Sequence, residues 1–336
     1  MSQAFATSCE GAVGVKYNFW WQQTMLRIKD PAASLRFYEQ NFGMKCIHSY
    51  DFPEYKFSLY FLELPRGSEQ VPTGTGKESE RYLWNMKSTC LELTHNYGTE
   101  QDPSFQVNNG NMEPHRGFGH IAFNTPNVEE ACRKLEQNSV KFRKRPDEGK
   151  MKNIAFVLDP DGYWIELVSR SATSPFTEEY NLSQTMLRIK DPSRSIPFYT
   201  GILGMRLIRK RHFDDFSLYF LACIPPDADI PDPKSDEAGL YLKNLWQPVL
   251  ELTHNHGTEN DKDFHYHNGN DNPQGYGHIG FLCDDLEGAC KELEVAGVSF
   301  RKKPQDGSMR GIAFIYDPDG YSIELIQRGV SFLKQD

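Results

Sequence analysis

The stretch QTMLRIKDP occupies residues 23–31 and occurs again, letter for letter, at residues 184–192. Its first six residues predict a β-strand. The Asp-Pro pair that follows is typical of a helix start, with aspartate as the N-cap and proline at the first helical position. A strand leading into a helix, present once in each half of the chain, indicates a duplicated α+β unit.

The duplication extends over almost the whole chain. Four further blocks return in the same order: FSLYFL (57–62 and 216–221), LELTHN (91–96 and 250–255), RGFGHIAF (116–123, returning as QGYGHIGF at 274–281) and DPDGYWIEL (159–167, returning as DPDGYSIEL at 317–325). We therefore predict homologous domains at 19–170 and 181–330, a linker at 171–180, an N-terminal tail at 1–18 and a C-terminal tail at 331–336. A strand–helix–strands pattern occurs twice in each half, which predicts four modules.

Composition excludes several classes of partner. The 336 residues carry a net charge of −9, which disfavours nucleic acid. No apolar run reaches the roughly 18 residues of a membrane helix. The first residues lack the basic and apolar regions of a secretory signal. Seven cysteines without a CxxC pair indicate reduced thiols and a cytoplasmic location.

Basic residues nevertheless gather in three short clusters: KFRKR at 141–145, RKR at 209–211 and FRKK at 300–303. Such clusters are usually solvated protein surface. In an acidic chain, the first and third clusters, which occupy equivalent places in the two halves, are also candidates for holding the carboxylates of a small acidic substrate.

Polar residues recur inside the predicted strands. Side chains of a strand point alternately to its two faces, so Leu91 and Leu93 can enter a core while Glu92 projects the other way. Glu166 has the same setting in DPDGYWIEL. With strand glutamines and histidines, and with the second-half counterparts, the candidate set is Gln23, Glu92, His120, Glu166, Gln184, Glu251, His278 and Glu324.

Nitrogen and oxygen donors without a thiolate suit a divalent ion such as zinc, nickel, cobalt or manganese. A solvated sheet face is the alternative interpretation of each residue taken singly, and a recent duplication can also copy a pattern without function. His95 and His254 alternate with the glutamates of LELTHN and face the other side, so we assign them to structure.

The repeated blocks resemble glyoxalase I (lactoylglutathione lyase) of the eukaryotic type, once per half and over nearly the whole chain. The resemblance implies an α+β vicinal-oxygen-chelate fold of four βαβββ modules. It also implies isomerisation of the hemithioacetal of methylglyoxal and glutathione to S-lactoylglutathione, by metal-assisted proton transfer through an enediolate. A two-half chain is similar to the fused, monomeric form of the family, with two sites between the halves and one divalent metal in each. Zinc is favoured, and nickel or cobalt fits the same ligands.

The resemblance also assigns residues. Gln23 and Glu92 are expected to share a metal with His278 and Glu324, and Gln184 and Glu251 with His120 and Glu166. Glu166 and Glu324 are the expected catalytic bases. The expected glutathione contacts are Arg27, Asn96, Arg116, Lys144, Arg188, Asn255 and Lys302. One position departs from the family pattern: Gln274 stands where the first half has Arg116. Because glutamine lacks the charged fork of arginine, we expect two functional but unequal sites.

Two other functions remain open at this point. A ring-cleaving iron dioxygenase uses two histidines and one carboxylate, and the glutamines stand where a second histidine would be needed. A non-catalytic binding protein of the same fold would not need the metal ligands, which both halves retain.

Overall fold

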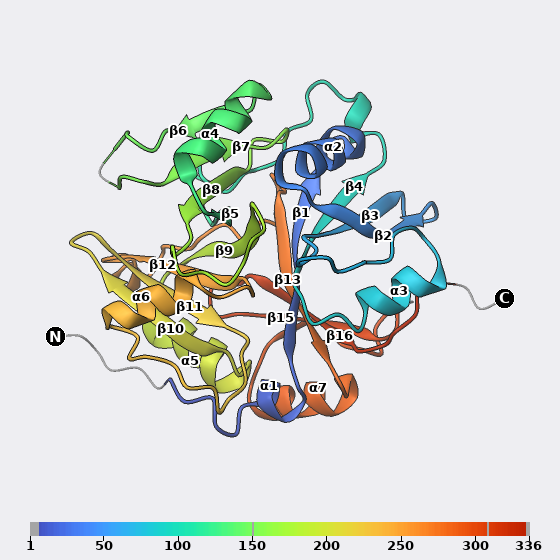
Figure 1. Cartoon of the computed structure of the whole chain (residues 1–336). Coiled ribbons are helices and arrows are strands. Elements are labelled where there is room, and N and C mark those ends of the chain that lie inside the picture. Colours follow the sequence, from blue (N-terminus) through green and yellow to red (C-terminus); the bar gives the residue numbers. More distant parts are fainter. Residues whose placement is uncertain (1–6, 150, 308, 334–336) are drawn as a thin grey trace.

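The computed structural model describes residues 7–149, 151–307 and 309–333. They form four modules of a strand, a helix and three strands (Figure 1). The first contains β1 (Trp20–Ile28), α2 (Pro31–Phe42), β2 (Lys45–Phe52), β3 (Phe57–Glu63), α3 (Lys77–Leu83) and β4 (Cys90–Asn96). The second contains β5 (Phe118–Thr125), α4 (Val128–Gln137), β6 (Lys141–Lys144), β7 (Ala155–Leu158) and β8 (Trp164–Ser169).

The second half repeats this order. The third module contains β9 (Asn181–Ile189), α5 (Pro192–Pro197), η2 (Phe198–Ile202), β10 (Arg206–His212), β11 (Phe216–Ala222), α6 (Asp236–Lys243) and β12 (Val249–Asn255). The fourth contains β13 (Tyr276–Cys283), α7 (Leu286–Val295), β14 (Phe300–Lys302), β15 (Ile312–Tyr316) and β16 (Ser322–Gln327). Short helices α1 (Val13–Lys16), η1 (Thr99–Gln101) and η3 (Thr258–Asn260) complete the elements. The predicted α+β fold of four modules is confirmed.

The two sheets do not coincide with the two halves of the sequence. One sheet has the order β14-β15-β16-β13-β1-β4-β3-β2 and joins the first and fourth modules. The other has the order β10-β11-β12-β9-β5-β8-β7-β6 and joins the second and third modules. The central contacts are the antiparallel pairs β1–β13 and β5–β9. Each half therefore contributes one module to each sheet, and the predicted domain limits at 19–170 and 181–330 remain a prediction.

The helix starts follow the Asp-Pro pairs. Asp30 accepts a hydrogen bond from the backbone N–H of Ala32 at 2.8 Å, and Gly43 ends α2 in the left-handed conformation. Such an N-cap satisfies backbone donors that the first turn leaves free. In the third module Pro197 cannot donate a backbone hydrogen bond. There α5 ends at Pro197 and the chain continues as the π-helix η2.

The prediction of an N-terminal tail over residues 1–18 is wrong for its second part. Cys9, Ala12 and Val13 are buried, and the Tyr17 hydroxyl donates to Glu292 at 2.8 Å. These contacts hold α1 beside α7, near the other end of the chain (Figure 1). Residues 1–6 of that predicted tail, and 334–336 of the predicted C-terminal tail, lie outside the described residues.

None of the helices in the described part of the chain is long and apolar enough to cross a membrane. All seven cysteines are free thiols.

Candidate metal centres

The predicted metal residues converge in two groups, each at the middle of one sheet. The His278 cluster is Gln23, Glu92, His278 and Glu324, on β1, β4, β13 and β16. The His120 cluster is Gln184, Glu251, His120 and Glu166, on β9, β12, β5 and β8. Each cluster draws two residues from each half of the sequence, in the pairing that the resemblance implied.

Strand register explains the convergence of the His278 cluster. Met25 pairs with Glu92 on one side and with His278 on the other. Gln23 lies two residues before Met25 and pairs with Gly280. Because alternate residues share a face, the four polar side chains project to the same side. A Cβ at position 280 would lie 2.7 Å from Cγ of Gln23, so the glycine leaves the space that the glutamine fills.

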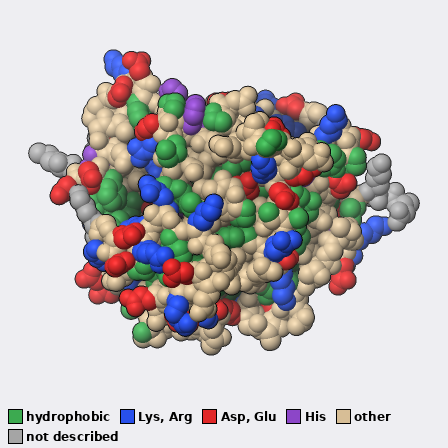
Figure 2. Space-filling model, turned by 90° about the horizontal axis from the view of Figure 1, so that it is seen from above, with side chains coloured by type: hydrophobic (Ala, Val, Ile, Leu, Met, Phe, Trp, Pro, Cys, Tyr) green, Lys and Arg blue, Asp and Glu red, His purple; other side chains and the backbone are tan. Residues whose placement is uncertain are grey.

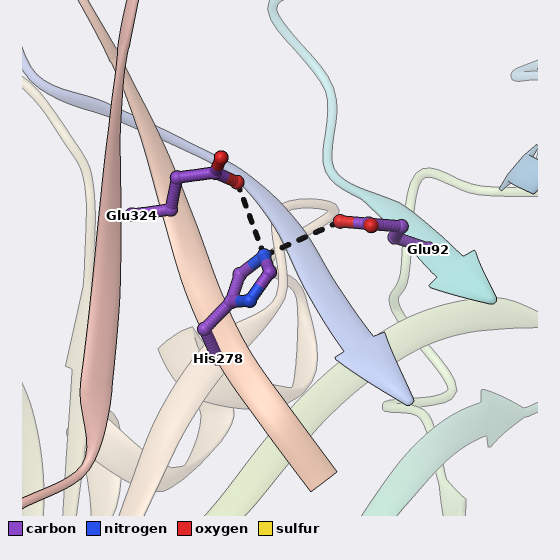
Figure 3. A group of neighbouring side chains, drawn as sticks. All are labelled: Glu92, His278 and Glu324. Carbon is purple, nitrogen blue, oxygen red and sulfur yellow. Dashed lines mark ion pairs between the residues drawn. The ribbon is translucent and has the colours of Figure 1, made fainter. Parts of the chain in front are cut away.

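Figure 3 shows how the charged side chains of this cluster meet. Nε2 of His278 lies 3.1 Å from Glu324 and 3.3 Å from Glu92. Nε2 of Gln23 donates to Glu92, donates to Glu324 at 2.9 Å, and lies 3.2 Å from Nε2 of His278. All four side chains are buried.

The His120 cluster has nearly the same geometry. Nε2 of His120 lies 3.3 Å from Glu166 and 3.6 Å from Glu251. Nε2 of Gln184 donates to Glu166 at 2.6 Å and to Glu251 at 2.8 Å. The duplication therefore reproduces a three-dimensional arrangement as well as a list of residue types.

Burial and the neighbouring charges have opposite effects on the pKa of the histidine in each cluster. Burial alone would lower the pKa of each histidine, but the adjacent carboxylates outweigh it and raise the pKa of His120 and of His278 to about 9. Burial raises the pKa of Glu166 and Glu324, and the neighbouring second glutamate adds to this effect. Without a further cation, each cluster holds its two carboxylates together through a protonated imidazole.

The donor set fits a divalent metal ion. In each cluster one histidine nitrogen and two carboxylate oxygens lie within 4.8 Å of one another. The buried Oε1 of Gln23 has no hydrogen-bond partner among the described residues, so turning this amide toward a metal would break no bond of the oxygen. A divalent cation would neutralise both carboxylates and take the place of the imidazole proton.

A cavity of about 780 Å³ opens beside the His120 cluster and includes Glu166, Gln184 and Glu251 in its wall. Its far side is formed by β10, β11 and α6. Glu251 pairs with Phe220, which pairs with Arg209 on the edge strand β10. Arg209 and Lys243 also line this cavity.

The corresponding positions around the His278 cluster are packed with side chains. Glu92 pairs with Phe61, which pairs with His48. His48 and Tyr50 align with Arg209 and Arg211 of the second half, and Trp84 aligns with Lys243. Tyr50 is 5% and Trp84 4% exposed, whereas Arg211 and Lys243 are exposed. Trp84 donates its indole N–H to the Tyr50 hydroxyl at 2.8 Å. Aromatic groups therefore occupy what is open space in the other half.

The end of the chain closes this region further. The Glu80 carboxylate accepts hydrogen bonds from the Ser331 hydroxyl at 2.6 Å and from the backbone N–H groups of Phe332 and Leu333 at 2.8 and 3.1 Å. The Phe332 ring packs against Trp84 with centroids 5.7 Å apart. The prediction of a C-terminal tail at 331–336 is thus wrong for residues 331–333, which form part of the packing.

The predicted glutathione residues are placed less uniformly. Arg188 donates to the backbone oxygens of Gly110, Gly117 and Phe118, and Arg27 makes the equivalent contacts in the other half. These guanidinium groups therefore also hold the loops before β5 and β13. Lys144 and Lys302 donate to backbone oxygens, and burial lowers their pKa.

The remaining predicted contacts differ between the halves. Arg116 reaches Glu113 at 3.2 Å, whereas Gln274 donates to the backbone oxygen of Asn270 at 2.9 Å. Asn255 donates to the Tyr266 hydroxyl at 2.9 Å, and the Asn96 side chain has no hydrogen bond with a described residue.

Sequence reasoning missed residues that surround the two clusters. Tyr50, Trp84 and Glu80 on one side, and Lys243 on the other, gave no motif, and RKR at 209–211 was attributed to solvated surface. Aligning the two halves position by position would have revealed these differences. Their position beside the two clusters depends on the pairing of β2 with β3 and of β10 with β11, which local sequence patterns do not predict.

Comparisons with known proteins agree with this geometry. The Glyoxalase/Bleomycin resistance protein/Dioxygenase superfamily matches residues 20–167 and 181–325. Glyoxalase I of Saccharomyces cerevisiae is 46% identical over 319 residues, covering 91% of this chain and 92% of the relative. Lactoylglutathione lyase of Schizosaccharomyces pombe is 44% identical, covering 91% and 95%. The crystal structure of glyoxalase I from Zea mays is 27% identical, covers 92% of each chain and superposes with a TM-score of 0.66. The chain therefore belongs to the glyoxalase I, or lactoylglutathione lyase, family.

Proposed function

We infer that the protein is a lactoylglutathione lyase that isomerises the hemithioacetal of methylglyoxal and glutathione to S-lactoylglutathione. The observation that carries this inference is the meeting of one glutamine, one histidine and two glutamates in each sheet, in a chain that is 46% identical to glyoxalase I of Saccharomyces cerevisiae. Neither cluster contains a second histidine within the described structure, which disfavours the iron dioxygenase.

We propose that each cluster binds one zinc ion, through His120, Glu166, Gln184 and Glu251 in one sheet and His278, Glu324, Gln23 and Glu92 in the other. A bound divalent cation would stabilise the negative charge that develops on the substrate oxygens during proton transfer. A neutral glutamine in place of a third carboxylate leaves more of the ionic charge available for this purpose.

Glu166 and Glu324 are the proposed bases. The reaction removes a proton from the carbon that bears sulfur and hydroxyl and returns one to the neighbouring carbon. A buried carboxylate at this position, shielded from water, can take the proton and deliver it again to a substrate whose two carbons are held beside it. Burial raises the pKa of each of these glutamates, whereas a bound divalent cation would lower it.

We propose that the two clusters are unequal and that most turnover takes place at the His120 cluster. Its cavity of about 780 Å³ provides room for the acyl part of a substrate. It also has Arg116 as a charged contact for glutathione, together with Lys144, Arg188 and Asn255. The His278 cluster has Gln274 at the equivalent place, beside Arg27, Asn96 and Lys302, and Tyr50, Trp84 and the C-terminal residues pack around it.

The remaining proposals concern the whole chain. We propose a monomer in the cytoplasm, with domains at 19–170 and 181–330. Free thiols at all seven cysteines support a reducing compartment. Both clusters are assembled within one chain, so neither requires a second subunit.

A methylglyoxal–glutathione assay on metal-depleted protein, with zinc, nickel and cobalt added back singly, tests the function. We expect almost no turnover without metal and recovery with added ion. Purified protein that carries no metal and turns over no adduct after any addition would contradict the proposal and favour the binding protein. The double variant Glu166→Gln with Glu324→Gln tests the bases, and substantial remaining activity would refute their assignment.

A further inference from the structure

The cavity beside the His120 cluster has a cationic far wall that the reaction of methylglyoxal does not require. Arg209, Arg211 and Lys243 line it, and Lys152 stands at its rim. The methylglyoxal adduct carries only a methyl group on its acyl side. Arg116, Lys144, Arg188 and Asn255, the proposed glutathione contacts, are not part of this lining.

Among these cations, Arg209 is more buried than Arg211 and Lys243. Its side chain is half-buried, and it makes no hydrogen bond or ion pair with another described residue. Burial lowers its pKa, the charge of Arg211 lowers it further, and the charge of Asp236 on α6 acts in the opposite direction. A half-buried guanidinium that makes no hydrogen bond with the protein has lost part of its hydration without compensation, so this group is suited to a ligand that brings a negative charge.

The backbone around Arg209 makes room for it. A Cβ at Gly239 would lie 1.3 Å from Nη1 of Arg209, so any side chain at position 239 would displace the guanidinium. The first half has Glu80 at the corresponding position and His48 in place of Arg209. Around the His278 cluster an acid therefore replaces the glycine that admits a cation here.

The charges of the cavity leave a positive balance once a metal is bound. The acidic residues in its lining are Glu166 and Glu251, which are proposed metal ligands, and the exposed Glu129 at the rim. The basic residues in the lining are Lys152, Arg209, Arg211 and Lys243. On the face of the molecule shown in Figure 2, acidic and basic side chains are intermixed. The positive charge of the cavity is therefore confined to its lining.

The distance suits a short substrate chain. Arg209 and Glu251 lie in one row on strands two apart, which places their backbones roughly 10 Å from each other. Phe220 lies between them in this row and is part of the same cavity lining, so a chain of two methylenes from the metal side would reach the arginine alongside the Phe220 ring.

We propose that this cavity is a subsite for an anionic group on the acyl part of the substrate. The His120 cluster would then accept glutathione hemithioacetals of 2-oxoaldehydes whose carbon chain ends in a carboxylate. This inference rests on the proposed lyase function and adds a substrate class to it.

The test compares two adducts of equal shape. One is formed from 4,5-dioxopentanoate, which ends in a carboxylate, and the other from 5-methyl-2-oxohexanal, in which an isopropyl group replaces the carboxylate. We expect kcat/KM of the wild-type protein to favour the anionic adduct by about tenfold or more, because a charge-assisted hydrogen bond contributes at least that much. The double variant Arg209→Gln with Arg211→Gln should reduce this ratio to about one or below.

Lys210→Gln is the matched control, because Lys210 lies between the two arginines on β10 but is not part of the cavity lining. It should keep the wild-type ratio. A wild-type ratio near one, or a ratio that the double variant leaves unchanged, overturns the subsite. Methylglyoxal turnover in the same preparations separates the two ideas: normal turnover with no preference refutes only the subsite, whereas no turnover of any adduct refutes the lyase function and the subsite with it.

Discussion

The His120 and His278 clusters have nearly identical centres and different surroundings. In both, the distances among histidine and glutamate atoms lie between 3.1 and 3.6 Å. Around one there is a cavity with arginines and a lysine, and around the other there are Tyr50, Trp84 and Phe332. The duplicated chain has thus kept the same candidate metal centre twice while changing the side chains around it.

The comparison shows that different elements of the fold position the cluster residues and shape the space beside them. Central strands β1, β4, β13 and β16, and their counterparts, determine which ligands meet. The edge strands β2 and β10 and the helices α3 and α6 determine what fits beside those ligands. We expect changes in the edge strands and helices to alter selectivity without moving the central residues, and the following variants test that separation.

The largest expected effect is that of Glu166→Gln. This change should remove nearly all of the turnover of the open cluster, because a general base usually contributes about 100-fold or more at its own site, and should leave only the smaller turnover of the His278 cluster. Glu324→Gln should retain most of the activity. Steady-state kinetics with the methylglyoxal adduct, with metal content measured in each preparation, makes the comparison. Equal losses in the two variants would show that the clusters work equally.

Trp84→Ala should have the next largest effect, this time on stability. The side chain is buried, and its loss should lower the free energy of unfolding by ~3–5 kcal/mol, as for other large-to-small core changes. Lys243→Ala, at the corresponding exposed position of the second half, should change it by less than about 0.5 kcal/mol. Denaturant unfolding measures both. Similar values would mean that Trp84 is not part of a packed region.

Removal of the residues after Val330 should have a smaller effect. The truncated chain loses three hydrogen bonds to the buried Glu80 carboxylate and should be destabilised by ~1–3 kcal/mol. In a Glu166→Gln chain, the same truncation should raise the residual turnover several-fold, because it uncovers the packed cluster. Unchanged stability and unchanged residual turnover would show that the segment neither stabilises nor closes this region.

The smallest expected effect is that of Arg116→Gln, which gives the open cluster the residue found at position 274. We expect KM for the methylglyoxal adduct to rise about tenfold, because one charged contact with a carboxylate is lost, and kcat to change little. Gln274→Arg provides the reciprocal variant. A fall in kcat without a change in KM would indicate that Arg116 acts on the reacting atoms.

The sequence predicted the residues of the two clusters because each is a polar residue in an apolar strand, and each occurs twice. It also predicted the α2 and α5 helix starts, where local hydrogen bonds from Asp30 and Asp191 decide the structure. It did not indicate that β1 pairs with β13, because that contact joins segments from opposite ends of the chain. Residues 9–18 and 331–333 have little local pattern, and their structure depends on distant partners such as Glu292 and Glu80.

The exchange of modules between the sheets has a consequence for the order of assembly. The sheet that carries the His120 cluster consists of residues between Phe118 and Asn255, so the middle of the chain can complete it during synthesis. Strand β1 emerges first, yet its antiparallel neighbour β13 begins at Tyr276. The first module must therefore keep one strand edge unpaired until the last quarter of the protein leaves the ribosome. Such an edge is prone to aggregation until β13 pairs with it.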